Sequence, residues 1–137
     1  MPTHSEHITA VLNAFNAADW DRMRELVPDS AVYHEPATGR TLQGDAFVEA
    51  LQGWRAAFPD VTGELTSVAE SGDIAVAEIT WTGTHDGTLV TPGGEIPASG
   101  KPQSTAAAWV GHYDGDTIVR TNHYFDMLGL LQQIGAV

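Results

Sequence analysis

The chain has 137 residues, the length of one domain, and 42% of them are hydrophobic, which is enough to build a packed core. Eighteen acidic residues against six basic ones give a net charge of −12, which argues against nucleic acids and anionic membranes as partners. Because the chain contains no cysteine, disulfides, thiolate metal sites and cysteine nucleophiles are excluded.

The first third of the chain is predicted to be helical. Apolar residues recur at the spacing of one helical stripe over residues 8–15. Thr3 and Glu6 precede that stripe at the spacing of a capping box. Asp19 is placed to cap a short second helix, which Pro28 ends.

A strand and a third helix are expected next. The strand spans about residues 31–35 and leads into a turn-rich segment at 36–39. Large apolar residues from Phe47 to Phe58 then fall on one helical face, and Pro59 stops the helix. Trp54 and Phe58 on this helix either line an aromatic pocket or fill the seam between helix and sheet.

Two hairpins are predicted in the second half of the chain. Residues 61–70 and 74–84 flank a Ser-Gly-Asp turn, and residues 103–113 and 117–126 flank an Asp-Gly turn. The glycine- and proline-rich segment 85–102 between the hairpins is expected to be a long loop of the kind that forms a binding rim or lid.

The order of these elements predicts an α+β domain over residues 1–137. Helices come first, and a run of strands follows without helices between them. We expect a cone-shaped, curved antiparallel sheet with the N-terminal helices packed on its concave face. A cone of this kind in a small domain is a natural pocket for a small molecule.

The end of the last strand carries the main catalytic candidate, Asp126. Side-chain alternation places Asp126 on one face with Tyr124 and Asn122, opposite mostly small residues in either register of the hairpin. A carboxylate walled in by apolar groups has a raised pKa and can exchange protons with carbon, while Tyr124 and Asn122 donate hydrogen bonds to an enolate oxygen. In the alternative, Asp126 caps the C-terminal segment.

Other chemistry-bearing residues are weaker candidates. His85 enters the long loop, where it either orients a substrate oxygen or is held by its neighbours. Tyr33, Trp109 and Phe15 join Trp54 and Phe58 as candidate substrate-binding residues. No spacing typical of metal ligands, nucleotide-binding loops or serine hydrolases is present, so we expect neither a metal nor a cofactor.

Five segments resemble, in matching order, the SnoaL-type polyketide (ester) cyclases of the nuclear transport factor two-like superfamily. The resemblance spans about residues 5–135, and its segments are Phe58–Val61, Gly83–Gly87, Ile96–Lys101, Asp114–Ile118 and Asp126–Gly135. It implies a cone-shaped α+β fold and a site in the cone that needs no cofactor. It also implies that Asp126 removes the proton α to an ester carbonyl and that His85 is a second pocket residue.

The implied reaction is ring closure of a hydrophobic, carbonyl-bearing small molecule by intramolecular aldol addition, as in polyketide biosynthesis. Isomerisation, dehydration or epoxide opening in the same cone and a non-catalytic ligand-binding module remain alternatives. The resemblance also implies a homodimer formed by the sheet surface that the helices leave uncovered, where Ile79 or Trp81 are expected. No signal peptide or apolar run of spanning length is visible, so a cytoplasmic location is expected.

Overall fold

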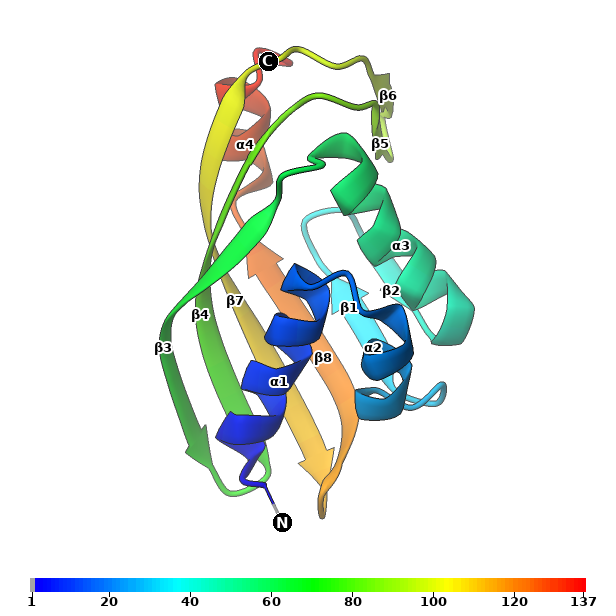
Figure 1. Cartoon of the computed structure of the whole chain (residues 1–137), viewed down its shortest axis with the longest axis vertical. Coiled ribbons are helices and arrows are strands. Elements are labelled where there is room, and N and C mark those ends of the chain that lie inside the picture. Colours follow the sequence, from blue (N-terminus) through cyan, green and yellow to red (C-terminus); the bar gives the residue numbers. More distant parts are fainter. Residues whose placement is uncertain (1) are drawn as a thin grey trace.

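The computed structural model describes residues 2–137 and shows helices packed on one face of a curved sheet (Figure 1). The first helices are α1 (His4–Asn16), α2 (Trp20–Leu26) and α3 (Gly44–Ala57), and a short α4 (Met127–Gln133) ends the fold. The strands are β1 (Val32–Glu35), β2 (Arg40–Leu42), β3 (Thr62–Ser71), β4 (Ile74–Thr84), β5 (Leu89–Thr91), β6 (Gly94–Ile96), β7 (Pro102–Asp114) and β8 (Thr117–Phe125). This arrangement confirms the predicted α+β class.

The expected helix signals at the N-terminus are present. The Thr3 hydroxyl accepts a hydrogen bond from the Glu6 amide at 3.1 Å, and the Glu6 carboxylate accepts one from the Thr3 amide at 3.3 Å. Asp19 caps α2 by accepting from the Arg22 amide at 3.0 Å. These caps satisfy backbone donors that would otherwise lack partners at the start of each helix.

Six strands form the main sheet in the order β2-β1-β8-β7-β4-β3. The two predicted hairpins, β3–β4 and β7–β8, form its larger part, and Gly115 takes a φ of +61° in the turn between β7 and β8. One pairing departs from the expected antiparallel sheet, because β1 pairs with β8 in parallel. The structure also places a two-stranded hairpin, β5–β6, inside the segment that the sequence predicted as loop.

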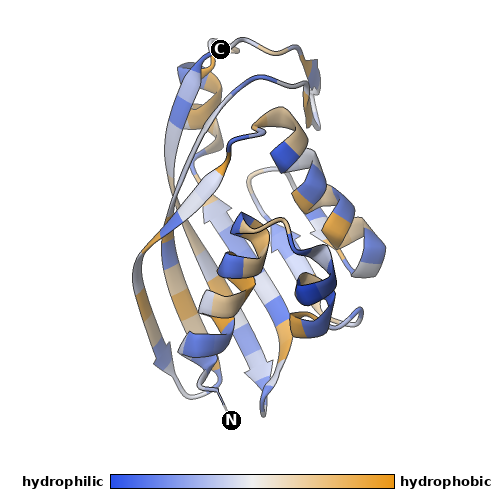
Figure 2. Ribbon diagram, viewed as in Figure 1, coloured by the Kyte–Doolittle hydropathy of each residue, from blue (hydrophilic) through white to orange (hydrophobic). Residues whose placement is uncertain are grey.

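The core lies between the helices and the concave face of the sheet. Ile8, Leu12 and Phe15 of α1 are buried there, as are Val48 and Leu51 of α3. Figure 2 shows hydrophobic and hydrophilic stretches alternating on the helices and strands, as expected of elements with one buried face. The sheet and helices therefore enclose an apolar interior.

The outer face of the sheet carries other residues than expected. Ile79 is only 1% exposed in the core, and Trp81 also points inward, so the prediction that they form the uncovered surface is wrong. Ala106 and Ala108 of β7 alternate with the inward-pointing Thr105 and Trp109 and occupy the outer face instead.

Candidate functional site

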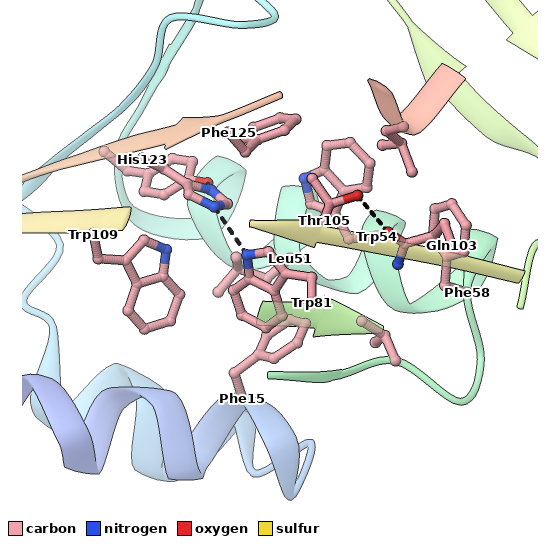
Figure 3. A pocket seen from close by; sticks show the side chains of 13 residues that line it. Phe15, Leu51, Trp54, Phe58, Trp81, Gln103, Thr105, Trp109, His123 and Phe125 are labelled. Atoms are coloured by element: carbon pink, nitrogen blue, oxygen red, sulfur yellow. Dashed lines mark hydrogen bonds between the residues drawn. The ribbon is translucent and has the colours of Figure 1, made fainter. Parts of the chain in front are cut away.

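An aromatic cavity of about 50 Å³ lies between the helices and the concave face of the sheet (Figure 3). Helices α1, α3 and α4 and strands β1, β4, β7 and β8 contribute its walls. The lining residues are Phe15, Tyr33, Leu51, Trp54, Phe58, Val61, Trp81, Gln103, Thr105, Trp109, His123, Phe125 and Leu130. Such a lining favours apolar ligands and leaves few polar groups to orient them.

Five of the seven predicted substrate-binding residues line this cavity, namely Phe15, Tyr33, Trp54, Phe58 and Trp109. They come from four elements or their ends that lie far apart in the chain, and the fold brings them together. Their role in binding a substrate stays a prediction, since no ligand contact is described. The structure thus supports the expectation of an aromatic pocket in the cone.

Asp126 lies outside the cavity, which corrects the expectation of a dehydrated carboxylate on the pocket floor. Its side chain is exposed and accepts a hydrogen bond from the Gly129 amide at 2.8 Å, so that it caps α4. The structure therefore matches the alternative interpretation of Asp126 as a cap. The physical reason is that β8 ends at Phe125, and the chain turns into a helix whose first amides need an acceptor.

Asn122 and Tyr124 also lie outside the cavity. Tyr124 is 48% exposed, and the Asn122 side chain accepts a hydrogen bond from Arg120 Nε at 2.9 Å. Strand alternation itself is observed, but His123 and Phe125 form the inward face of β8. The prediction that Asn122 and Tyr124 donate hydrogen bonds in the pocket is therefore wrong, because it assumed that the opposite face of β8 is turned inward.

His85 is fully buried but does not line the cavity. Its Nδ1 accepts a hydrogen bond from the Ser99 amide at 3.2 Å and lies 2.9 Å from the Ser99 hydroxyl. Its backbone also bonds to Lys101 and Gly100 at the far end of the loop. This geometry favours a structural role in which His85 holds the two ends of segment 85–101 together.

A buried hydrogen-bond network reaches the cavity through His123. The Glu35 carboxylate, which is 0% exposed, accepts from the Tyr33 hydroxyl at 2.7 Å, and His123 Nδ1 lies 2.7 Å from the same hydroxyl oxygen. On the other side of the ring, Trp81 Nε1 donates to His123 Nε2 at 3.1 Å (Figure 3). The network thus links a buried carboxylate, a phenol and an imidazole in line.

The hydrogen-bond partners define the protonation of this network. Because the Trp81 indole only donates, His123 Nε2 must be the acceptor, and the proton of the neutral imidazole is therefore on Nδ1. His123 Nδ1 then donates to the Tyr33 oxygen, and the Tyr33 hydroxyl donates to Glu35. Every bond points toward the carboxylate, which places the basic lone pair of His123 on the nitrogen that faces Trp81.

Burial and charge set the pKa values in the network. Burial lowers the pKa of His123 to about 4, although the nearby Glu35 charge opposes this change. Burial raises the pKa of Glu35, but hydrogen bonds from Thr38 and Tyr33 and the charge of Arg40 outweigh it, so the net pKa is lowered. Burial and the Glu35 charge raise the pKa of Tyr33 well above its usual value. Near neutral pH the network therefore holds a carboxylate, a neutral imidazole and a neutral phenol.

The sequence reasoning missed His123 and Glu35 as site residues. Neither was among the predicted site residues, and no cluster of three potential metal-ligating residues occurs among residues 2–137. A weak signal was available in the alternation of Thr121, His123 and Phe125, which places a histidine beside an aromatic residue on one strand face. Strand alternation places Tyr33 and Glu35 on the same face of β1, but nothing in the local sequence shows that this face is the buried one.

Comparisons with known proteins agree with this fold. A family model described as SnoaL-like polyketide cyclase matches residues 5–134. IdmH from Streptomyces antibioticus, a proposed polyketide cyclase, is 26% identical with a TM-score of 0.80, covering 96% of this chain and 97% of that chain. A proposed polyketide cyclase from Acidithiobacillus ferrooxidans is 26% identical with a TM-score of 0.76, covering 98% of each chain. A search of curated proteins gave no match.

A further solved structure supports the fold. A protein with a ketosteroid isomerase-like fold from Catenulispora acidiphila is 20% identical with a TM-score of 0.80, covering 98% of this chain and 96% of that chain. None of the helices among residues 2–137 has the length and hydropathy required to cross a membrane. Because the family model spans almost the whole chain, the chain belongs to the family of SnoaL-like polyketide cyclases.

Proposed function

We propose that this protein is a cyclase-type enzyme that activates a hydrophobic carbonyl compound by acid–base chemistry at His123, without a cofactor. The observation that carries the proposal is the position of the His123 imidazole in the aromatic cavity, where hydrogen bonds link it through Tyr33 to Glu35. Among the side chains that line the cavity, Tyr33 and His123 are the two that ionise. Family membership supports a cyclase-type reaction, and the cavity supports a small apolar substrate.

In the proposed reaction, His123 Nε2 takes a proton from the carbon next to a carbonyl group. The C–H bond breaks, an N–H bond forms, and the electron pair passes into an enolate. Glu35 stabilises the imidazolium through Tyr33, as an orienting carboxylate does in a catalytic triad. The Trp81 N–H has to release the Nε2 lone pair before this proton transfer, and it can then donate to the enolate oxygen.

Ring closure then requires no further reagent. The enolate carbon attacks a second carbonyl carbon of the same molecule, a C–C bond forms, and the resulting alkoxide takes the proton back from His123. The atoms of substrate and product balance, so the reaction is an isomerisation. The aromatic walls keep water away from the enolate and hold the two reacting carbons together.

Proton exchange at carbon tests the proposal. The wild-type protein in D₂O is incubated with acetophenone, 1-indanone and methyl phenylacetate, and NMR follows the loss of the α-proton signals. We expect acceleration by the wild type, a loss of at least about tenfold in His123→Gln and little change in Asp126→Asn. Calorimetric titration of each variant with the same compounds separates lost chemistry from lost binding.

The outcomes separate the proposal from its rivals. Loss of exchange in Asp126→Asn with binding retained would transfer the role of the base to Asp126, as the family resemblance implied. Binding without exchange in the wild type would favour a ligand-binding module. That second candidate has an observation of its own, because Trp81 already occupies the lone pair of His123 that a base needs.

A further inference from the structure

A second and larger hollow lies on the other side of Trp54. Helix α3, strand β2 and the segment around β5 form a surface groove of about 420 Å³, compared with about 50 Å³ for the inner cavity. Among the described residues, Trp54 is the one that lines both spaces. The groove and the cavity are therefore neighbours that one side chain separates.

The volumes show that the inner cavity holds only part of a substrate. A dry protein cavity that binds benzene measures about 150 Å³, roughly three times the volume found here. A ring with a carbonyl group thus needs the side chains of the cavity to move, and a molecule of polyketide size needs space beyond the cavity. The groove lies within the range of about 300–1,000 Å³ that is typical of small-molecule sites.

Trp54 is held in a way that permits such movement. It is half-buried, and its Nε1 donates a long hydrogen bond of 3.3 Å to Glu35. Its ring meets Phe125 edge to face at a centroid distance of 5.6 Å and stacks near Phe58 at 6.5 Å. A rotation of Trp54 would open the wall, and the Glu35 carboxylate would keep its stronger bonds to Tyr33 and Arg40.

The groove also has the chemistry of a binding site. Leu42, Ala50 and Val90 provide apolar surface, and the side chain of Arg40 is 34% exposed at the groove while its Nη2 donates to Glu35 at 3.0 Å. A guanidinium carries five N–H donors, so Arg40 retains donors for a ligand oxygen. Glu49 on the same wall disfavours an anionic ligand.

We infer that this groove is the subsite for the non-reacting part of the substrate, with Trp54 as the movable wall between the two parts. This inference rests on the proposed function, which places the reacting carbonyl in the inner cavity. The expected occupant is an apolar chain or ring with a neutral ether, ester or hydroxyl oxygen that accepts a hydrogen bond from Arg40. The substrate is then an elongated molecule, of which the cavity takes one end.

Gly53 offers a selective way to block the groove. A Cβ at this position meets no atom within 4 Å, so a side chain there extends into open space in the groove. Leucine also favours the helix over glycine, which protects the fold of Gly53→Leu. Gln52→Leu is the matched control, because it introduces the same side chain at the adjacent exposed position of α3, outside the groove lining.

The test compares two ligands by calorimetry, acetophenone and 4-hexyloxyacetophenone, which adds an alkyl ether to the same ketone. In the wild type we expect the longer ligand to bind at least about tenfold more tightly. In Gly53→Leu the ratio of the two Kd values should fall to within about twofold, while Gln52→Leu keeps the wild-type ratio.

Two results would overturn the subsite. One is a wild-type ratio near one, and the other is an unchanged ratio in Gly53→Leu. The ratio is a binding measurement and involves no turnover, so it stays valid if His123→Gln retains full proton exchange. Failure of the proposed function and failure of the subsite are therefore distinguishable.

Discussion

The buried neutral state of His123 predicts that acid destabilises the fold in a specific pH range. The pKa of His123 is about 4 in the folded protein, against 6.5 for an unperturbed histidine. Between pH 4 and pH 6.5, His123 therefore binds a proton in the unfolded chain but not in the folded chain. Stability from this residue is fully present above pH 6.5 and is lost as the pH falls toward 4.

The size of this loss in the free energy of unfolding follows from the same two pKa values. Each pKa unit corresponds to about 1.4 kcal/mol, so the complete loss is about 3 kcal/mol. Between pH 7 and pH 5 the linkage relation gives a loss of about 2 kcal/mol in the free energy of unfolding. The low exposure of His123, 6%, means that solvent screening does not weaken this effect much.

Urea unfolding near pH 7 and near pH 5 measures the loss in wild type, His123→Gln and His34→Gln. In His123→Gln the difference between the two pH values should shrink by about 2 kcal/mol relative to wild type, whatever the absolute stability of the variant. His34→Gln controls for the removal of a histidine, because His34 lies on strand β1 outside the network. The same pH dependence in His123→Gln and wild type would refute the buried neutral assignment.

Three further predictions concern other parts of the molecule. Glu35→Gln should reduce the free energy of unfolding by about 1–3 kcal/mol in urea titrations, because it removes the buried charge that pairs with Arg40 and leaves one acceptor oxygen where the carboxylate has two. Asp126→Ala should lower stability by about 1 kcal/mol through the lost cap of α4, and an unchanged unfolding curve would contradict the capping role. We also predict a homodimer through the outer face of the sheet, and light scattering should then show that Ala108→Arg, at the middle of this face, is monomeric.

The parts of the fold that local sequence determines were predictable. The Thr3–Glu6 capping box and the apolar stripe at residues 8–15 involve neighbours in the chain, and they fix helix α1. The Asp-Gly dipeptide at residues 114–115 likewise fixes the turn between β7 and β8, because glycine adopts the positive φ that the turn requires. Such signals need no knowledge of distant residues.

The parts that depend on distant contacts were not predictable. Both faces of β8 carry polar and aromatic residues, so the alternation of Asn122, His123 and Tyr124 does not say which face the helices cover. The buried position of Glu35 depends on Trp54 of α3 and His123 of β8, which approach its carboxylate from distant parts of the chain. The parallel pairing of β1 with β8 joins segments far apart in the chain, and no turn marks it.

Backbone hydrogen bonds of His85 hold the two ends of the segment after β4 together. The His85 amide donates to the Lys101 carbonyl at 2.9 Å, and the Gly100 amide donates to the His85 carbonyl at 2.8 Å, so the chain enters and leaves at one point. Insertions or deletions between His85 and Gly100 change the β5–β6 hairpin without altering the register of β4 and β7. The length of this segment can therefore change in this chain while the main sheet stays constant.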